Sequence, residues 1–143
     1  MIIGQYSYII DDKKRVGIPT KFRNSLKQGG KQGGVLTKGF EGCLYLYPQK
    51  EWEHFLDLVN RLPYFDPATR EMKRSVVGSA MDVKLDSAGR ILIPDYLKEY
   101  AELNKNIIII GLNDHIELWN EEKWKNYSPD LDKISNNLKE FGL

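Results

Sequence analysis

The amino-acid sequence predicts an α+β fold made of two tandem βαβ-type repeats with accessory helices. The main observation is an internal duplication, because residues 10–19 and 85–94 both read apolar-Asp-x-x-x-Arg-apolar-x-Ile-Pro. A second pair of similar blocks follows in the same order, residues 35–47 with residues 107–119. Two correlated blocks in one order are far harder to obtain by chance than a single motif, so we infer a duplication that sets the architecture.

Within each half, the first elements are a strand, a turn and a second strand. Apolar residues alternate with polar or smaller ones over residues 6–10 and again over residues 81–85, which is typical of half-buried strands. Three residues then separate Asp from Arg in each motif, which predicts a short hairpin connection. Gly89 supplies the positive φ that such a turn often needs, whereas Lys14 holds that place in the first half. The first turn is therefore expected to be either strained or differently shaped.

Helices are predicted to follow the strands in each half. Pro19 and Pro94 have no N–H for sheet pairing and suit the first turn of a helix. The remaining expected elements are a glycine-rich break at residues 29–34, a strand pair at residues 35–38 and 43–47, and helices at residues 52–59, 67–75 and 129–141. We expect a first repeat over residues 1–60, an accessory helical segment over 61–75, a second repeat over 76–127 and a C-terminal helix over 128–143.

Length and composition limit the possible classes of protein. The 143 residues suffice for one ordinary domain or two small ones, and 41% of them are hydrophobic. The longest aliphatic run, residues 107–110, is too short to cross a bilayer, and we recognise no secretion signal. We therefore expect a cytoplasmic protein with no membrane partner. A lone Cys43 and two histidines, His54 and His115, predict neither an internal disulfide nor a zinc site.

The charges are unevenly distributed along the chain. The formal net charge is only +1, yet residues 1–38 contain eight Lys or Arg against two Asp. Residues 76–143 contain eight basic and twelve acidic side chains. Such an asymmetry indicates nucleic-acid contact, although a chance fluctuation of surface charge explains it equally well when taken alone.

Candidate enzyme sites do not hold up against their simpler explanations. Residues 29–34 lack the Gly-Lys-Ser/Thr order of a phosphate-binding loop, and Asp11 and Asp12 lack further ligands at calcium-loop spacing. Cys43 and His115 occupy equivalent places in different halves, which argues against a nucleophile and base pair. We therefore expect no enzyme activity, no catalytic or metal-binding residue, no cofactor and no small-molecule substrate.

The two Asp-x-x-x-Arg motifs remain, and two interpretations of them stay open. In the first, Asp pairs with Arg across the turn and stabilises the fold alone. In the second, Asp11, Asp86 and Gly89 anchor the turns so that Arg15 and Arg90 project toward nucleic acid. A guanidinium can bind phosphate or a guanine edge with two hydrogen bonds. Lys13 and Lys14 would add phosphate attraction beside the first arginine.

The paired motifs, their separation and the strand-Trp-helix segments between them resemble the MraZ family over essentially the whole chain. MraZ proteins are part of the wider AbrB/MazE-like group, so the resemblance implies a swapped-hairpin barrel with pseudo-two-fold symmetry. It further implies a sequence-specific bacterial transcriptional regulator that represses its own division and cell-wall gene cluster. Such a protein binds repeated short promoter boxes on double-stranded DNA as a ring-shaped homo-oligomer, and is associated with the nucleoid.

Carried over by residue, the resemblance assigns DNA binding to Arg15 and Arg90 and their anchoring to Asp11 and Asp86. The glycine usual in the family before the arginine is replaced by Lys14, and we expect the more basic first half to contribute the larger electrostatic share. A second function stays open, namely a protein-interaction module of antitoxin-like barrel architecture without DNA specificity of its own.

Overall fold

The computed structural model describes residues 1–30, 32–127 and 129–142 of the chain. Its strands are β1 (Ile2–Ile9), β2 (Arg15–Gly17), β3 (Gly33–Lys38), β4 (Leu44–Pro48), β5 (Met81–Lys84), β6 (Arg90–Leu92), β7 (Asn106–Asn113) and β8 (Ile116–Asn120). Its α-helices are α1 (Thr20–Arg23), α2 (Gln49–Asn60), α3 (Pro67–Met72), α4 (Asp95–Tyr100), α5 (Glu121–Tyr127) and α6 (Leu131–Leu138). Short 3₁₀ or π turns are η1 (Ser25–Gly30), η2 (Phe40–Gly42), η3 (Lys73–Val77) and η4 (Lys139–Phe141).

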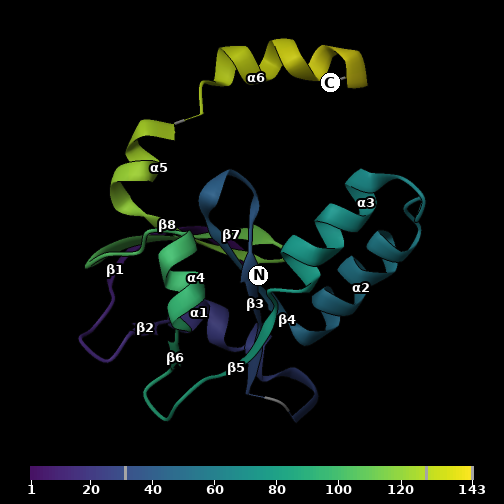
Figure 1. Ribbon diagram of the computed structural model, residues 1–143. Coiled ribbons are helices and arrows are strands. Elements are labelled where there is room, and N and C mark those ends of the chain that lie inside the picture. Colours follow the sequence, from purple (N-terminus) through teal and green to yellow (C-terminus); the bar gives the residue numbers. More distant parts are fainter. Residues whose placement is uncertain (31, 128, 143) are drawn as a thin grey trace.

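The strands of the two halves are exchanged. A six-stranded antiparallel sheet has the order β1-β7-β8-β4-β3-β5, and β2 pairs with β6 in a separate two-stranded ribbon (Figure 1). The first strand of each half thus pairs with the other half, β1 with β7 and β5 with β3. Because β4–β8 and β2–β6 join equivalent strands, both pairs lie on the pseudo-two-fold axis. The α+β, swapped-hairpin architecture is therefore confirmed.

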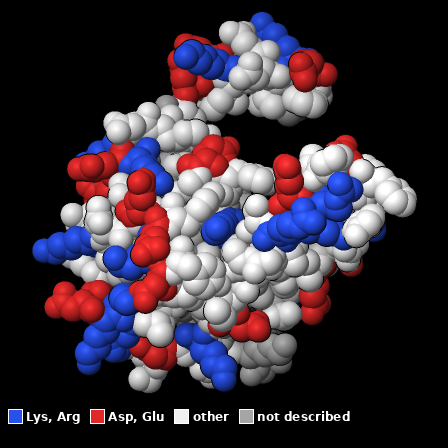
Figure 2. Space-filling model, viewed as in Figure 1, with Lys and Arg blue, Asp and Glu red and all other residues white. Residues whose placement is uncertain are grey.

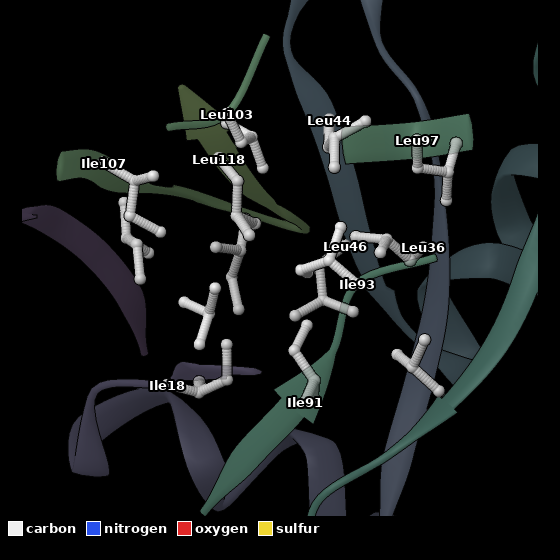
Figure 3. Packing of buried hydrophobic residues seen from close by; sticks show 14 of the residues in the cluster. Ile18, Leu36, Leu44, Leu46, Ile91, Ile93, Leu97, Leu103, Ile107 and Leu118 are labelled. Atoms are coloured by element: carbon white, nitrogen blue, oxygen red, sulfur yellow. The ribbon is translucent and has the colours of Figure 1, made fainter. Parts of the chain in front are cut away.

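The main core lies between the six-stranded sheet and the β2–β6 ribbon. Figure 3 shows aliphatic side chains from both halves meeting there, including Ile18 and Ile93, which directly precede the two prolines. Val16 of β2 and Ile91 of β6 are opposite one another and are 0% and 1% exposed. Alternate residues of a strand face opposite sides, so this buried pair leaves both neighbours of each residue on the outer side of the ribbon.

The turns join strands that part from one another, whereas the residue spacing alone predicted a short hairpin. Two backbone hydrogen bonds close the first turn, from the Asp11 N–H to Arg15 O and from the Lys14 N–H to Asp11 O. Beyond them, an isolated bridge joins Ile10 to Val16, and β1 and β2 then pair with different partners. A conventional two-stranded hairpin is therefore the wrong description, because each strand satisfies its hydrogen bonds with the other half of the chain.

The predicted helices are largely confirmed. Both α1 and α4 begin directly after the prolines, and Phe22 and Leu97 are the fully buried residues of their inner faces. The helix expected over residues 67–75 changes to a π turn at Lys73–Val77. On the outer face of the sheet, Trp52 of α2 packs on Tyr47 with ring centroids 5.6 Å apart. No helix among residues 1–30, 32–127 and 129–142 is long and apolar enough to cross a membrane.

The strand exchange predicts that both halves unfold together. Leu118→Ala should lower the free energy of unfolding by about 2–5 kcal/mol, because it leaves a cavity in a core that both halves share. Leu46 is the equivalent residue of the first half, and both leucines are 0% exposed, so Leu46→Ala should have a similar effect. Urea denaturation followed by circular dichroism and tryptophan fluorescence should give one coincident transition for each variant. Two separate transitions would contradict a shared core.

Candidate nucleic-acid interface

The first turn is held together by one carboxylate. Asp11 Oδ1 accepts hydrogen bonds from the backbone N–H groups of Lys13 and Arg15, each at 2.9 Å. Asp11 Oδ2 accepts one from Arg15 Nε at 2.8 Å. The carboxylate therefore satisfies the turn backbone on one side and fixes the direction of the arginine on the other.

The second turn repeats this geometry atom by atom. Asp86 Oδ1 accepts from the N–H groups of Ala88 and Arg90, each at 2.9 Å, and Oδ2 accepts from Arg90 Nε at 2.9 Å. In both turns the residue before the arginine donates its N–H to the carbonyl of the aspartate, at 3.0 Å. The duplicated motif thus encodes two copies of one local structure, as the sequence predicted.

Lys14 has the same backbone conformation as its glycine counterpart. Its φ is 62°, against 75° for Gly89, so the first turn is strained rather than differently shaped. The left-handed region costs a residue with a Cβ about 1–2 kcal/mol. The Lys14 ammonium forms an ion pair with Asp95 of α4, a helix of the other half. Both side chains of this pair are well exposed, so it offsets at most a part of the backbone cost.

The β2–β6 ribbon places both arginines on one face. Arg15 and Arg90 flank the buried Val16–Ile91 pair on opposite strands, so their side chains emerge on the outer side. Arg90 Nη1 also lies 3.9 Å from Asp11 Oδ2, which links the two turns directly. Figure 2 shows basic and acidic side chains interspersed at the lower left of the molecule, where Figure 1 shows the two turns.

The environment of the two aspartates keeps them ionised. The backbone N–H of Arg15, and then its side chain and the N–H of Lys13, hold the pKa of Asp11 below its ordinary value, against a smaller opposing effect of burial. Arg90 acts on the pKa of Asp86 in the same way. At neutral pH each arginine therefore keeps its Nε on a carboxylate. Apart from the longer contact of Arg90 Nη1 with Asp11 Oδ2, no described residue pairs with the terminal Nη groups, which suit a planar, two-pronged contact with phosphate or guanine.

Other cations near the turns come from both halves. Lys13 is exposed in the first turn, and Lys98 and Lys105 line a shallow surface hollow that Lys14 also borders. Arg23 of α1 was not singled out from the sequence, yet it packs against Gly89 in the second turn. Only the strand exchange brings the helix of one half to the turn of the other, so the linear sequence offered no signal for this contact.

The remaining candidate residues have structural environments. Cys43 is fully buried and lies 3.3 Å from the carbonyl oxygen of Phe40, and burial raises the pKa of its thiol far above the ordinary value. His54 is exposed on α2. His115 stacks on Tyr47 with ring centroids 5.1 Å apart. Among the residues that the structure describes, no group of three His, Cys, Asp or Glu could hold a metal ion.

Comparisons with known proteins agree with this internal symmetry. The model of the family described as "MraZ protein, putative antitoxin-like" matches the chain twice, over residues 1–75 and 76–140. The "Transcriptional regulator MraZ" of Lachnoclostridium phytofermentans is 41% identical over 144 residues, covering 100% of this chain and 99% of that protein. The protein of the same name from Clostridium acetobutylicum is 40% identical over 146 residues, covering all of both chains. That of Roseiflexus sp. is 42% identical over 132 residues, covering 92% of this chain and 90% of its own.

The left-handed residue of each turn gives a test of the site geometry. Lys14→Gly should be about 1 kcal/mol more stable than Lys14→Ala, because both variants lose the ammonium but only the glycine removes the backbone strain. Gly89→Ala should lower stability by about 1–2 kcal/mol, because the new Cβ meets both the positive φ and the Arg23 guanidinium. Chemical denaturation measures each difference. Equal stability of the two Lys14 variants would show that this turn does not hold the left-handed conformation.

Proposed function

This chain belongs to the MraZ family, and on that premise we propose that it is a sequence-specific DNA-binding transcriptional regulator rather than an enzyme. The observation that carries the proposal is the pair of matching Asp–Arg turns on one face of the β2–β6 ribbon. Both family-model matches contain one such turn, and the relatives compared above are named as transcriptional regulators. We further propose that it acts in the cytoplasm at the nucleoid, as a repressor of its own division and cell-wall gene cluster.

Each turn is suited to hold a guanidinium in place before DNA arrives. Asp11 fixes Arg15 through Nε, and Asp86 fixes Arg90, so little side-chain freedom is lost on binding. The terminal nitrogens then meet a guanine edge or a phosphate with two parallel hydrogen bonds. Lys13 adds an exposed cation for the DNA backbone. In this account the aspartates position the arginines and the arginines contact DNA.

Several copies of the protein would strengthen this small interface. One chain offers few cations at the two turns. Each neutralised phosphate contributes only about −0.9 to the slope of log K against log salt. Linked copies that face consecutive promoter boxes gain ~10²–10⁴-fold in avidity without new contacts. We therefore propose a ring-shaped homo-oligomer on repeated boxes, in which residues 1–60 and 76–127 form the DNA-binding repeats and residues 61–75 and 128–143 serve assembly.

Exposed apolar side chains support these two segments as assembly surfaces. Figure 1 shows α6 standing away from the sheet and from the other helices. Leu131 of α6 is 79% exposed, Phe141 after it is 71% exposed, and Phe65 before α3 is 90% exposed. Large apolar side chains as exposed as these favour a protein contact at both segments.

The DNA-binding proposal is tested by the double variant Arg15→Gln/Arg90→Gln. Glutamine carries an amide nitrogen where arginine has Nε, so the bond to each aspartate is retained while the charged tip is lost. Specific retention of the upstream DNA in a gel-shift titration should weaken at least ~30-fold, since each two-pronged contact contributes ~1–3 kcal/mol. Wild-type binding should also weaken steeply as salt rises.

A charge-matched control distinguishes the turns from general cationic attraction. Lys50→Gln/Lys125→Gln removes two positive charges from α2 and α5, away from the turns, and should bind nearly as the wild type does. Unchanged retention by the arginine double variant would refute the assignment of these residues. It would favour the alternative, a protein-interaction module with the same barrel architecture.

The assembly proposal is tested on α6. Leu131, Ile134 and Leu138 lie on one side of this helix, so Ile134→Asp should break the subunit contact and lower the mass of the particle. Asn136→Asp adds the same charge on the opposite side and should leave the mass unchanged. Light scattering coupled to size-exclusion chromatography measures both. A particle of undiminished mass for Ile134→Asp would exclude this face from assembly.

A further inference from the structure

Arg23 of α1 lies directly over the second turn. A Cβ atom at Gly89 would overlap the carbon of its guanidinium group and lie 2.7 Å from Nη1. Gly89 is therefore required for two reasons, since its φ is 75° and any side chain would displace the arginine. Lys14 is the counterpart of Gly89 in the first turn. The Arg23 guanidinium lies where a side chain in the position of Lys14 would lie in the second turn.

Two hydrogen bonds at Ile18 fix this arrangement. The Ile18 N–H donates to the carbonyl of Gly89 at 2.9 Å, and the Ile18 carbonyl accepts from Arg23 Nε at 2.7 Å. One residue thus holds both the turn and the arginine. In the part of the chain that the structure describes, the terminal nitrogens of Arg23 make no hydrogen bond or ion pair. They therefore present a fixed pair of donor groups at a partly exposed position.

At the first turn a different residue supplies the extra cation. There the Ile93 N–H donates to the carbonyl of Lys14, at 2.8 Å, in the way that Ile18 meets Gly89. The helix residue equivalent to Arg23 is Lys98, and the turn itself supplies the cation through Lys14. The extra cation therefore comes from the turn in one case and from the helix of the opposite half in the other. The excess of positive charge in the first half of the sequence is thus shared between the two turns.

We propose that Arg23 binds a DNA phosphate beside the second turn, so that this turn and a helix of the other half contact DNA together. This inference rests on the proposed function, since it adds a contact to the same interface. Among the described residues, the Arg23 side chain is hydrogen-bonded through Nε alone, so its two Nη groups match two oxygens of one phosphate. Such a contact adds affinity and fixes orientation, and does not depend on the base sequence.

Arg23→Gln tests the inference in the full-length protein. The glutamine retains a nitrogen at the position of Nε for the Ile18 carbonyl and removes the charged tip. Binding to the upstream DNA at 0.15 M salt should weaken by about fivefold for each protein copy whose Arg23 contacts the DNA. The slope of log K against log salt should fall by about 0.9 per such copy. Binding to unrelated DNA of equal length should weaken by the same factor, because phosphate contacts are common to all sequences.

Two further variants separate a phosphate contact from a structural role. Arg23→Lys keeps the charge and loses the Nε bond, so it should restore most of the salt slope. Lys125→Gln removes one charge from α5 and should bind as the wild type does. The thermal midpoint of Arg23→Gln should stay within about 3 °C of the wild-type value, because the bond to the Ile18 carbonyl is retained.

Each contrary outcome has its own meaning. Wild-type slope and affinity in Arg23→Gln, beside lost binding in Arg15→Gln/Arg90→Gln, would overturn this inference and leave the proposed function standing. Weaker binding with an unchanged slope, a lowered thermal midpoint and no recovery in Arg23→Lys would also overturn it, by showing a structural role. Failure of the wild-type protein to retain its upstream DNA would overturn both proposals.

Discussion

The pairing of β2 with β6 across the two halves fixes where both turns lie. Val16 and Ile91 meet at its centre and are 0% and 1% exposed, so the inner side of the ribbon packs on the main core. Because each turn leads directly into this ribbon, the two arginines are held on one rigid face. If the halves folded separately, each ribbon strand would lose its partner, and nothing would fix the relative position of the turns.

The magnitude of the Asp–Arg interactions indicates what they do. The side chains of Asp11 and Arg15 are 35% and 30% exposed, and a solvent-exposed ion pair contributes only about 0–1 kcal/mol to stability. The same carboxylate also accepts two backbone hydrogen bonds, which define the turn. Stability alone is therefore a weak explanation for two identical copies of this arrangement. Fixing the direction of a guanidinium needs the two backbone bonds, which hold the carboxylate, and the Nε bond, which holds the arginine. The negative charge of the aspartate then partly offsets the attraction of the arginine to DNA.

Local features of the fold could be predicted from the residue pattern itself, whereas the exchange between halves was implied only by the resemblance to the MraZ family. The duplicated motif, the alternating residues of β5 and the prolines before α1 and α4 act within a few residues, and they predicted turns, strands and helices correctly. The pairing of β1 with β7 depends on contacts between distant segments, for which one sequence gives no signal. Arg23 was missed for that reason, since its partner Gly89 belongs to the other half. The conformation of Lys14 stayed open because propensity disfavours it and only the surrounding structure imposes it.

A structure of the protein bound to its own upstream DNA would show whether Arg15 and Arg90 contact the duplex. We expect the terminal nitrogens of Arg15 and Arg90 to lie within about 3.5 Å of DNA atoms while both Nε–aspartate bonds persist. DNA bound to another surface, or both turns buried in a contact between subunits, would refute the proposed interface.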